Sequence, residues 1–371
     1  MTLLIILMSC SSNNVSEKET PLDNAVAPPE NFPYIFAKKP TDGKHVYIPN
    51  ELKSNNFNSN ASKWSYQRSA SSDNIIVFWE SGFGQYPSKT ANMNLHVKID
   101  NLLTMAEKFY AYYRDTMKFV IEGASQTDNY RMIVMLIYQD EWLATGAGYD
   151  DVIGALWINP STTKIASVIG HEFGHSFQYQ THCDGNYGFR DQNYVGSFWE
   201  QCAQYMSWQI HNDGYTNDLP FLLKNIHKNF SHEDIRYQSI YLQEYWKEKH
   251  GVDFLGKLWR EAVLPEHPIE TYKRITGINQ EQFNDEVFEY ACKNITWEYP
   301  LGNFNRNYIK SLPISNQVEY KHKTKLKPIE NDYYQIDESQ IPQSYGYNAI
   351  ELTVPNSGTI VSIDFIGLDN P

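Results

Sequence analysis

The sequence predicts an α+β fold in which a small mixed sheet precedes a largely helical region. Apolar runs rich in β-branched and aromatic residues, typical of buried strands, are confined to the first 160 residues. From there to about residue 297, apolar residues recur mainly at steps of three and four, as on one face of a helix. With 15% aromatic and 20% charged residues, the chain of 371 residues can bury a core and does not have the composition of a disordered protein.

The charge balance argues against a nucleic-acid partner. The chain carries 31 basic and 44 acidic residues, a net charge of −13, and no run of five like charges. Nucleic acids are bound through clusters of Lys and Arg, so this class of partner is not expected. A mean hydropathy of −0.55 also excludes a protein with many membrane spans.

The amino terminus resembles the lipobox of a bacterial lipoprotein, since an apolar run ends in Leu7, Met8, Ser9 and Cys10. The alternative is an ordinary buried segment. The resemblance implies a signal over residues 1–10 and a membrane anchor at a lipidated Cys10. Residues 11–38, rich in Ser, Asn, Glu and Pro, would then be a flexible tether. We therefore expect the protein at the bacterial cell envelope, outside the cytoplasm.

The predicted sheet is built from three short apolar runs. They cover residues 74–79, 131–138 and 153–158, and each is bounded by polar or Gly-containing segments. Between the first two, regularly spaced apolar residues predict a long helix over 92–119. Gly146 and Gly148 predict a bend before the third run.

Helices follow the last of these strands. Pro160 ends the strand, Ser161 or Thr162 caps the next helix, and apolar helical spacing begins at Ile165. Further helices are expected over 193–211, 218–228, 234–249, 252–263, 269–275 and 279–294.

The pattern of apolar and polar residues changes after residue 300. Short alternating runs over 348–354 and 359–365, separated by Pro, Asn, Ser and Gly, predict a hairpin. Because a lone hairpin is only marginally stable, we interpret 301–371 as the start of a carboxyl-terminal β domain within which the chain stops.

The pentad His171-Glu172-Phe173-Gly174-His175 lies on the helix that follows Ile165. Residues at i and i+4 of a helix share one face, with Cβ atoms about 5–6 Å apart, so both imidazoles can reach one ion. Glu172 lies about 100° around the helix axis, where it can contact a water on the same ion. The pattern predicts a hydrolytic zinc site. The alternative is a pair of buried core histidines beside a solvated Glu.

A catalytic zinc needs a third protein ligand. The metzincin pattern would require Gly at position 178 and His at position 181, but the chain has Gln178 and Thr181. Asp184, in a segment similar to part of the aspzincin motif, is one candidate. Glu200 is the favoured candidate, since it lies on the next helix beside the buried face.

The pentad followed by Glu200 resembles the gluzincin arrangement of zinc metallopeptidases. The resemblance implies a zincin-like catalytic domain over 39–300, with its core at 73–300. Such a domain has a small mixed sheet, an active-site helix and a helical carboxyl-terminal subdomain. In gluzincins an edge strand before the pentad helix binds extended substrate, and 153–158 occupies that place. The core also resembles a secreted bacterial family of unknown function, in which HExxH follows a strand ending in Asn and Pro and precedes FWE.

The resemblance assigns catalytic roles as well. Glu172 would be the general base, and a later helix would supply a Tyr to the reaction centre. The segment 234–249 matches that helix, with Tyr237 as the first candidate and Tyr241 as the next. Many gluzincins carry an Asp four residues after the ligand Glu, whereas this chain has Gln204, a neutral acceptor that would weaken the metal site.

These observations predict a zinc-dependent hydrolase acting on peptide bonds of proteins or glycoproteins. Zn²⁺ lowers the pKa of a bound water, Glu172 takes its proton, and Tyr237 shares the oxyanion charge. The alternative is a surface lipoprotein with a structural or inactive zinc site, whose 27 Tyr and 9 Trp bind glycans or proteins. Glu172 favours the enzyme, since a structural site closed by a fourth ligand needs no base.

The cysteines leave one structural question open. Cys183 and Cys202 bracket the loop between the two ligand helices, where a disulfide would hold these helices together in an exported protein. The alternative is two buried thiols that pack as small apolar residues. Cys292 stays unpaired in either case.

Overall fold

The computed structural model describes residues 40, 42–190, 196–211, 215–321, 324–330 and 333–351. Cys10, the expected tether 11–38 and most of the hairpin expected over 348–365 lie outside these residues. Within the described part of the chain, no helix combines the length and the hydropathy needed to cross a membrane. The predictions of a lipid anchor and of the terminal hairpin therefore stay predictions.

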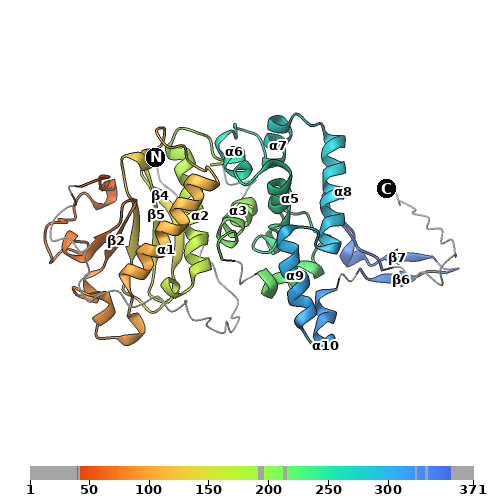
Figure 1. Ribbon diagram of the computed structural model, residues 1–371, viewed down its shortest axis with the longest axis horizontal. Coiled ribbons are helices and arrows are strands. Elements are labelled where there is room, and N and C mark those ends of the chain that lie inside the picture. Colours follow the sequence, from red (N-terminus) through yellow and green to blue (C-terminus); the bar gives the residue numbers. More distant parts are fainter. Residues whose placement is uncertain are drawn as a thin grey trace.

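A mixed five-stranded sheet forms one half of the molecule (Figure 1). Its strands are β1 (Ser69–Ser71), β2 (Ile75–Trp79), β3 (Met132–Leu136), β4 (Ala144–Tyr149) and β5 (Ile153–Ile158). Their order is β1-β2-β3-β5-β4, with β2, β3 and β5 parallel and the two edge strands antiparallel to their neighbours. The central strands β2 and β3 are buried along their whole length, which explains their continuous apolar sequences.

The expected positions of the edge strand and of the glycine bend were wrong. The strand Ile153–Ile158 lies inside the sheet between β3 and β4, and the glycine-containing segment is β4 itself, the edge strand. A β carbon at Gly146 would lie 1.9 Å from the carbonyl oxygen of Glu172. One at Gly148 would lie 2.3 Å from the Tyr179 ring. These glycines therefore allow a helix to approach the strand closely, and do not form a bend.

Two helices pack on the sheet (Figure 1). They are α1 (Ile99–Ala111), which continues into a π-helical turn over Tyr112–Thr116, and α2 (Ala166–Cys183). The helix α1 contacts β2, and α2 contacts β4, β5 and α1. Large aromatic side chains fill the space between them, with Tyr113 donating a hydrogen bond to the Gly170 carbonyl at 2.9 Å. The pentad helix is thus held against the edge of the sheet.

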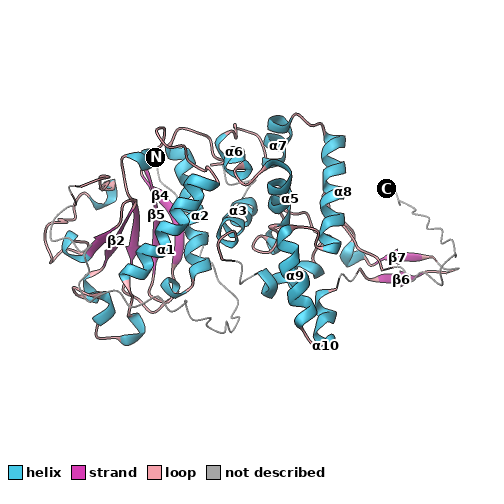
Figure 2. Ribbon diagram, viewed as in Figure 1, coloured by secondary structure: helices cyan, strands magenta, loops and turns pink. Residues whose placement is uncertain are grey.

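The other half of the molecule is helical (Figure 2). It contains α3 (Gly196–Trp208), α4 (Tyr215–Lys224), α5 (Tyr241–His250), α6 (Phe254–Arg260), α7 (Pro268–Thr276), α8 (Gln280–Thr296), α9 (Pro300–Ser311) and α10 (Ile314–Gln317). The helix α3 lies next to α2, between the sheet and the remaining helices (Figure 1). The prediction of an α+β fold, with a mixed sheet followed by helices, is confirmed.

Two local predictions in this half differ from the structure. The segment 234–249 is divided into a short 3₁₀ turn, Glu233–Ile235, and α5, because the His232 side chain caps the turn and the helix begins at Tyr241. Residues 300–311, expected at the start of a β domain, form α9. Pro300 occupies its first position, where a missing N–H costs no hydrogen bond. A short hairpin, β6 (Leu326–Pro328) and β7 (Tyr334–Ile336), follows. The domain boundaries stay predictions.

Candidate metal centre

The helix α2 places the two histidines of the pentad side by side. The Nε2 atoms of His171 and His175 lie 3.0 Å apart, one helical turn from each other. Both side chains are buried, with 5% and 8% of the residue surface exposed. Because α2 is a regular helix from residue 166 to residue 183, the four-residue spacing by itself brings these rings to one face.

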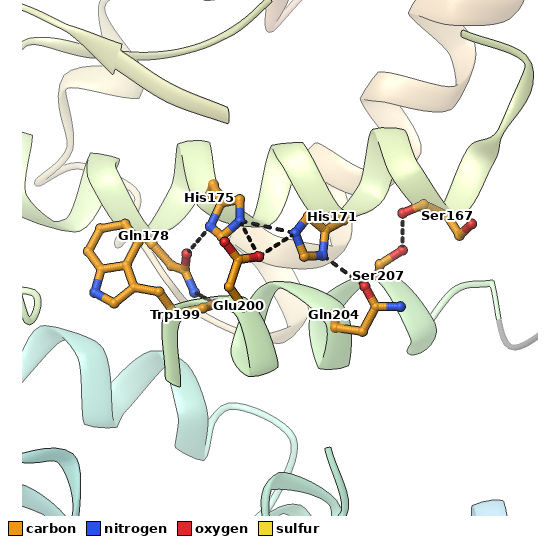
Figure 3. Close-up of polar contacts among 8 residues, drawn as sticks. All are labelled: Ser167, His171, His175, Gln178, Trp199, Glu200, Gln204 and Ser207. Atoms are coloured by element: carbon orange, nitrogen blue, oxygen red, sulfur yellow. Dashed lines mark hydrogen bonds and ion pairs between the residues drawn. The ribbon is translucent and has the colours of Figure 1, made fainter. Parts of the chain in front are cut away.

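Small residues allow α3 to approach α2 at the same level. A β carbon at Gly174 would lie 3.0 Å from Cα of Ala203, so the two backbones nearly touch there. One turn further on, the Ser207 hydroxyl donates to the Ser167 carbonyl at 2.6 Å (Figure 3). Positions 200, 203 and 207 share one face of α3, and Glu200 on this face points toward the two imidazoles (Figure 3).

The Glu200 carboxylate completes a group of three possible metal ligands. Its Oε2 lies 3.0 Å from Nε2 of His171 and 3.3 Å from Nε2 of His175. Ligand atoms about 2.0–2.1 Å from one zinc ion at tetrahedral angles are about 3.3 Å apart. The three atoms therefore have the spacing that a tetrahedral ion requires, and they come from donor types that zinc prefers.

Two glutamines fix the orientation of the imidazoles (Figure 3). The Nδ1 atom of His171 lies 2.9 Å from Oε1 of Gln204, and that of His175 lies 2.8 Å from Oε1 of Gln178. The Nε2 amide of Gln178 donates to the Trp199 carbonyl at 2.9 Å, so its oxygen faces the histidine. Since amide oxygens accept hydrogen bonds, we place the proton of each neutral ring on Nδ1.

This protonation leaves three lone pairs facing one another. Both Nε2 atoms and the Glu200 oxygen are then acceptors at contact distance, an arrangement that needs a cation or an added proton. Burial lowers the pKa of His175, but the Glu200 charge outweighs it and raises this pKa to about 9. Burial raises the pKa of Glu200, and the two histidines more than offset this, so the pKa falls below its usual range. The group attracts positive charge.

Glu172, the pentad's carboxylate, lies between α2 and the edge strand β4. Its side chain is buried, and the backbone amide of Gly146 acts to lower its pKa. Burial is the main reason that its pKa is raised, while the neighbouring histidines oppose this shift. Glu172 is therefore held beside the three ligand atoms by the strand as well as by its own helix.

The two candidate tyrosines lie in different environments. Tyr237 is half-buried in the turn before α5, and its ring centroid lies 5.9 Å from that of His171. Tyr241 is buried in the core, where its hydroxyl accepts a hydrogen bond from Asn305 at 3.0 Å and its ring packs against Trp297. The structure therefore brings Tyr237, and not Tyr241, next to the candidate metal centre.

The alternative ligand Asp184 lies at the carboxyl end of α2, outside the group of three. Its carboxylate accepts hydrogen bonds from the backbone N–H of Gln126 and from the Gln180 amide, each at 2.9 Å. Cys183 and Cys202 are free thiols and form no disulfide in this structure. The Cys202 sulfur instead accepts a weak hydrogen bond from Gln243 at 3.9 Å.

The sequence did not predict the positions of three residues in or near the centre. Gln178 was considered solely as a departure from another motif, although its position three residues after His175 places it on the same helix face. Gly146 was assigned to a bend. Arg236, which follows the Glu233–Ile235 turn, had no sequence signal, since its proximity to the centre depends on tertiary packing.

The chain was compared with models of known protein families. The model described as "Family of unknown function (DUF6055)" matches residues 38–371, which is most of the chain. No protein with a curated description matches.

Proposed function

We propose that this chain, which belongs to the DUF6055 family of unknown function, is a zinc-dependent hydrolase that cleaves peptide bonds of proteins or glycoproteins. One observation carries the proposal. Two imidazole nitrogens and a carboxylate oxygen converge within 3.3 Å, beside a buried second carboxylate, that of Glu172. The resemblance of this pattern to gluzincin peptidases supports the reaction type, and the lipobox-like segment ending at Cys10 supports a place at the cell envelope.

The ligand set favours zinc in a catalytic site. Two neutral imidazoles and one carboxylate form the type of ligand set found at hydrolytic zinc sites, and the softer thiolates of structural sites are absent from the described group. Three protein ligands leave one position for water and substrate. When bound here, zinc would supply Lewis acidity, lowering the pKa of a water and polarising a carbonyl.

The side chains around the centre then have separate roles in the reaction. Glu172 accepts the proton of the attacking water and passes it to the leaving amine. Gln178 and Gln204 hold the imidazoles in the tautomer that presents Nε2 to the centre. Tyr237, whose ring centroid lies 5.9 Å from that of His171, donates a hydrogen bond to the oxygen on which negative charge develops.

The position of β4 at the edge of the sheet favours a peptide as the substrate. This strand is the last strand of the described sheet, and Gly146 in its middle packs against the backbone of Glu172. An extended peptide can add to such an edge through main-chain hydrogen bonds. A peptide bound along β4 in this way would have its scissile bond next to Glu172.

The test combines metal content with peptide cleavage. The protein beginning at residue 11 is purified with zinc, and zinc per chain and the cleavage of a proteome-derived peptide library are measured for wild type, H175A and E172Q. We expect about one zinc and cleavage for wild type, little zinc for H175A, and zinc without cleavage for E172Q, with a rate loss of at least about 100-fold. Cleavage by E172Q at the wild-type rate would exclude Glu172 as the base. Zinc binding by wild type without any cleavage would favour a binding protein.

A further inference from the structure

Arg236 places a guanidinium next to Tyr237, the tyrosine that lies near the candidate metal centre. It lies in the turn between the Glu233–Ile235 segment and α5, and its Cζ lies 5.2 Å from the ring centroid of Tyr237. The Tyr237 ring is in turn 5.9 Å from the ring of His171. Burial lowers the pKa of Arg236, but contacts with Tyr237 and Glu233 and the charge of Glu200 raise it overall. Arg236 therefore stays charged within the field of the metal ligands.

The partner of Arg236 is a carboxylate that solvent can replace. Its Nη1 lies 2.7 Å from Oε1 of Glu233, whose side chain is 77% exposed, while the Arg236 side chain is 34% exposed. An exposed ion pair of this kind contributes little to stability. The guanidinium can thus exchange Glu233 for another carboxylate at little cost, and Glu233 shows that a carboxylate fits there.

The charges of the centre favour an anionic ligand. Two neutral imidazoles and the Glu200 carboxylate would leave a bound divalent ion with one net positive charge, which the carboxylate of Glu172 balances. Arg236 adds a positive charge near Tyr237 when its exposed partner Glu233 turns to solvent. In a protein with a net charge of −13, this is a local site for a negative group.

We propose that Arg236 binds a carboxylate of the substrate close to the bond that is cleaved, so that the enzyme prefers acidic peptides. This inference rests on the proposed peptidase function and specifies its substrate class. A guanidinium binds a carboxylate through two parallel hydrogen bonds, which gives orientation as well as affinity. The carboxylate comes either from the carboxyl terminus of the peptide or from an Asp or Glu side chain.

The first experiment compares matched peptides on the zinc-loaded protein. Peptides that the wild type cleaves are made with Glu or Gln beside the scissile bond, and with a free or an amidated carboxyl terminus. We expect kcat/KM to be about tenfold higher for the carboxylate form, mainly through KM, and this ratio to fall to about one in R236Q. Amidation removes the preference if the terminal carboxylate is bound, and Glu→Gln in the peptide removes it if a side chain is bound.

Two further variants test the assignment. In E233Q the competing carboxylate is removed, so the preference for acidic peptides rises about two- to threefold. R274Q removes a positive charge from an exposed ion pair with Glu266 in the helical half, and leaves the preference unchanged. If R236Q slows cleavage of acidic and amidated peptides by the same factor, Arg236 merely supports the fold around Tyr237, and the proposal is wrong.

A binding experiment separates this inference from the proposed function. The monohydroxamate of succinic acid and its primary amide share a zinc-binding group and differ in a carboxylate. Calorimetry on the zinc-loaded wild type is expected to show about tenfold tighter binding of the acid, and equal binding of both by R236Q. If no peptide is cleaved, the peptidase proposal fails while this result still supports Arg236 as a carboxylate site. Equal affinities for the wild type, or no binding of either compound, overturn the inference.

Discussion

The helix α2 carries two clusters of side chains that could bind metals, and they differ in how their polar atoms are paired. In the middle of the helix, His171 and His175 direct Nε2 lone pairs at each other and at Glu200, at 3.0–3.3 Å. At its carboxyl end, the consecutive residues His182, Cys183 and Asp184 offer an imidazole, a thiol and a carboxylate. The first cluster gathers acceptors around one point, and the second does not.

The end cluster is already satisfied by the protein. Nδ1 of His182 faces the Asn186 carbonyl at 3.2 Å, and its Nε2 accepts a hydrogen bond from Arg190. Burial raises the pKa of the Cys183 thiol well above its usual range, which keeps the sulfur protonated. The Asp184 carboxylate accepts hydrogen bonds from the Gln126 backbone and the Gln180 amide. Convergence of unpaired acceptors, and not residue type, thus distinguishes a candidate metal centre from a capped helix end.

The sharpest test of this comparison removes one carboxylate from each cluster. We expect E200A to weaken zinc binding by at least about 100-fold, because it removes a ligand and not merely a hydrogen-bond partner of one. D184A is expected to keep the wild-type affinity within about threefold. Competition with a chelator of known affinity measures both. Comparable losses in the two variants would show that the end cluster takes part in metal binding.

The next largest effect concerns the amides behind the imidazoles. Q178A and Q204A are each expected to weaken zinc binding by about 10- to 100-fold, because each frees one imidazole to rotate or change tautomer. Q204E is expected to strengthen binding, since a carboxylate increases the basicity of His171. Q180A is the control at the other cluster, where the amide donates to Asp184. Wild-type zinc affinity in both Q178A and Q204A would contradict the assigned orientation.

Variants at two glycines distinguish the effect of crowding at the centre from the effect of backbone strain at the end of α2. G146A forces β4 away from α2, and we expect it to lower the free energy of unfolding by about 1–3 kcal/mol and to weaken zinc binding. Gly185 has open space around it but a φ of +89°, so G185A is expected to lower stability by about 1 kcal/mol with unchanged zinc affinity. Chemical denaturation and zinc titration measure the two effects. Weaker zinc binding in G185A would contradict the separation.

The smallest effect concerns the charge of Asp184. Burial, with a contribution from Asp128, raises its pKa despite the hydrogen bonds that it accepts. A carboxyl group with a raised pKa in the folded state loses stability as the pH rises from its unfolded to its folded pKa. We therefore expect D184N, which keeps an acceptor oxygen, to gain stability relative to wild type as the pH rises above the ordinary carboxyl range. A melting-temperature difference that stays constant over this rise in pH would contradict the prediction.

The ligand group could be predicted because its geometry is nearly local. The spacing of His171 and His175 fixes one helix face, and Asp184, nine residues beyond His175, lies about 13 Å further along the same helix. This distance follows from the structure, since the sequence alone does not show that the helix continues to Cys183. Glu200 is separated from His175 by a loop, but its position beside the buried face of a helix directed it toward α2.

Features that depend on tertiary packing could not be predicted in this way. Gly146 and Gly148 have the local sequence character of a turn, and they lie in a strand because α2 and Tyr179 occupy the space next to them. Arg236 reaches the centre because a 3₁₀ turn and α5 replace one continuous helix. Pro300 favours the first turn of a helix, which the polar, alternating texture of the following residues concealed.

The close contact of α2 and α3 also has a consequence for chain entropy. The sequence left open whether a disulfide between Cys183 and Cys202 joins these helices, and in the structure both thiols are free. An ion held by His175 and Glu200 would cross-link the chain around a loop of about 25 residues. Closing a loop of that length lowers the conformational entropy of the unfolded chain, which corresponds to about 3–4 kcal/mol of stabilisation. The metal would then act as a reversible cross-link, so that zinc binding and folding of the helical half become linked equilibria.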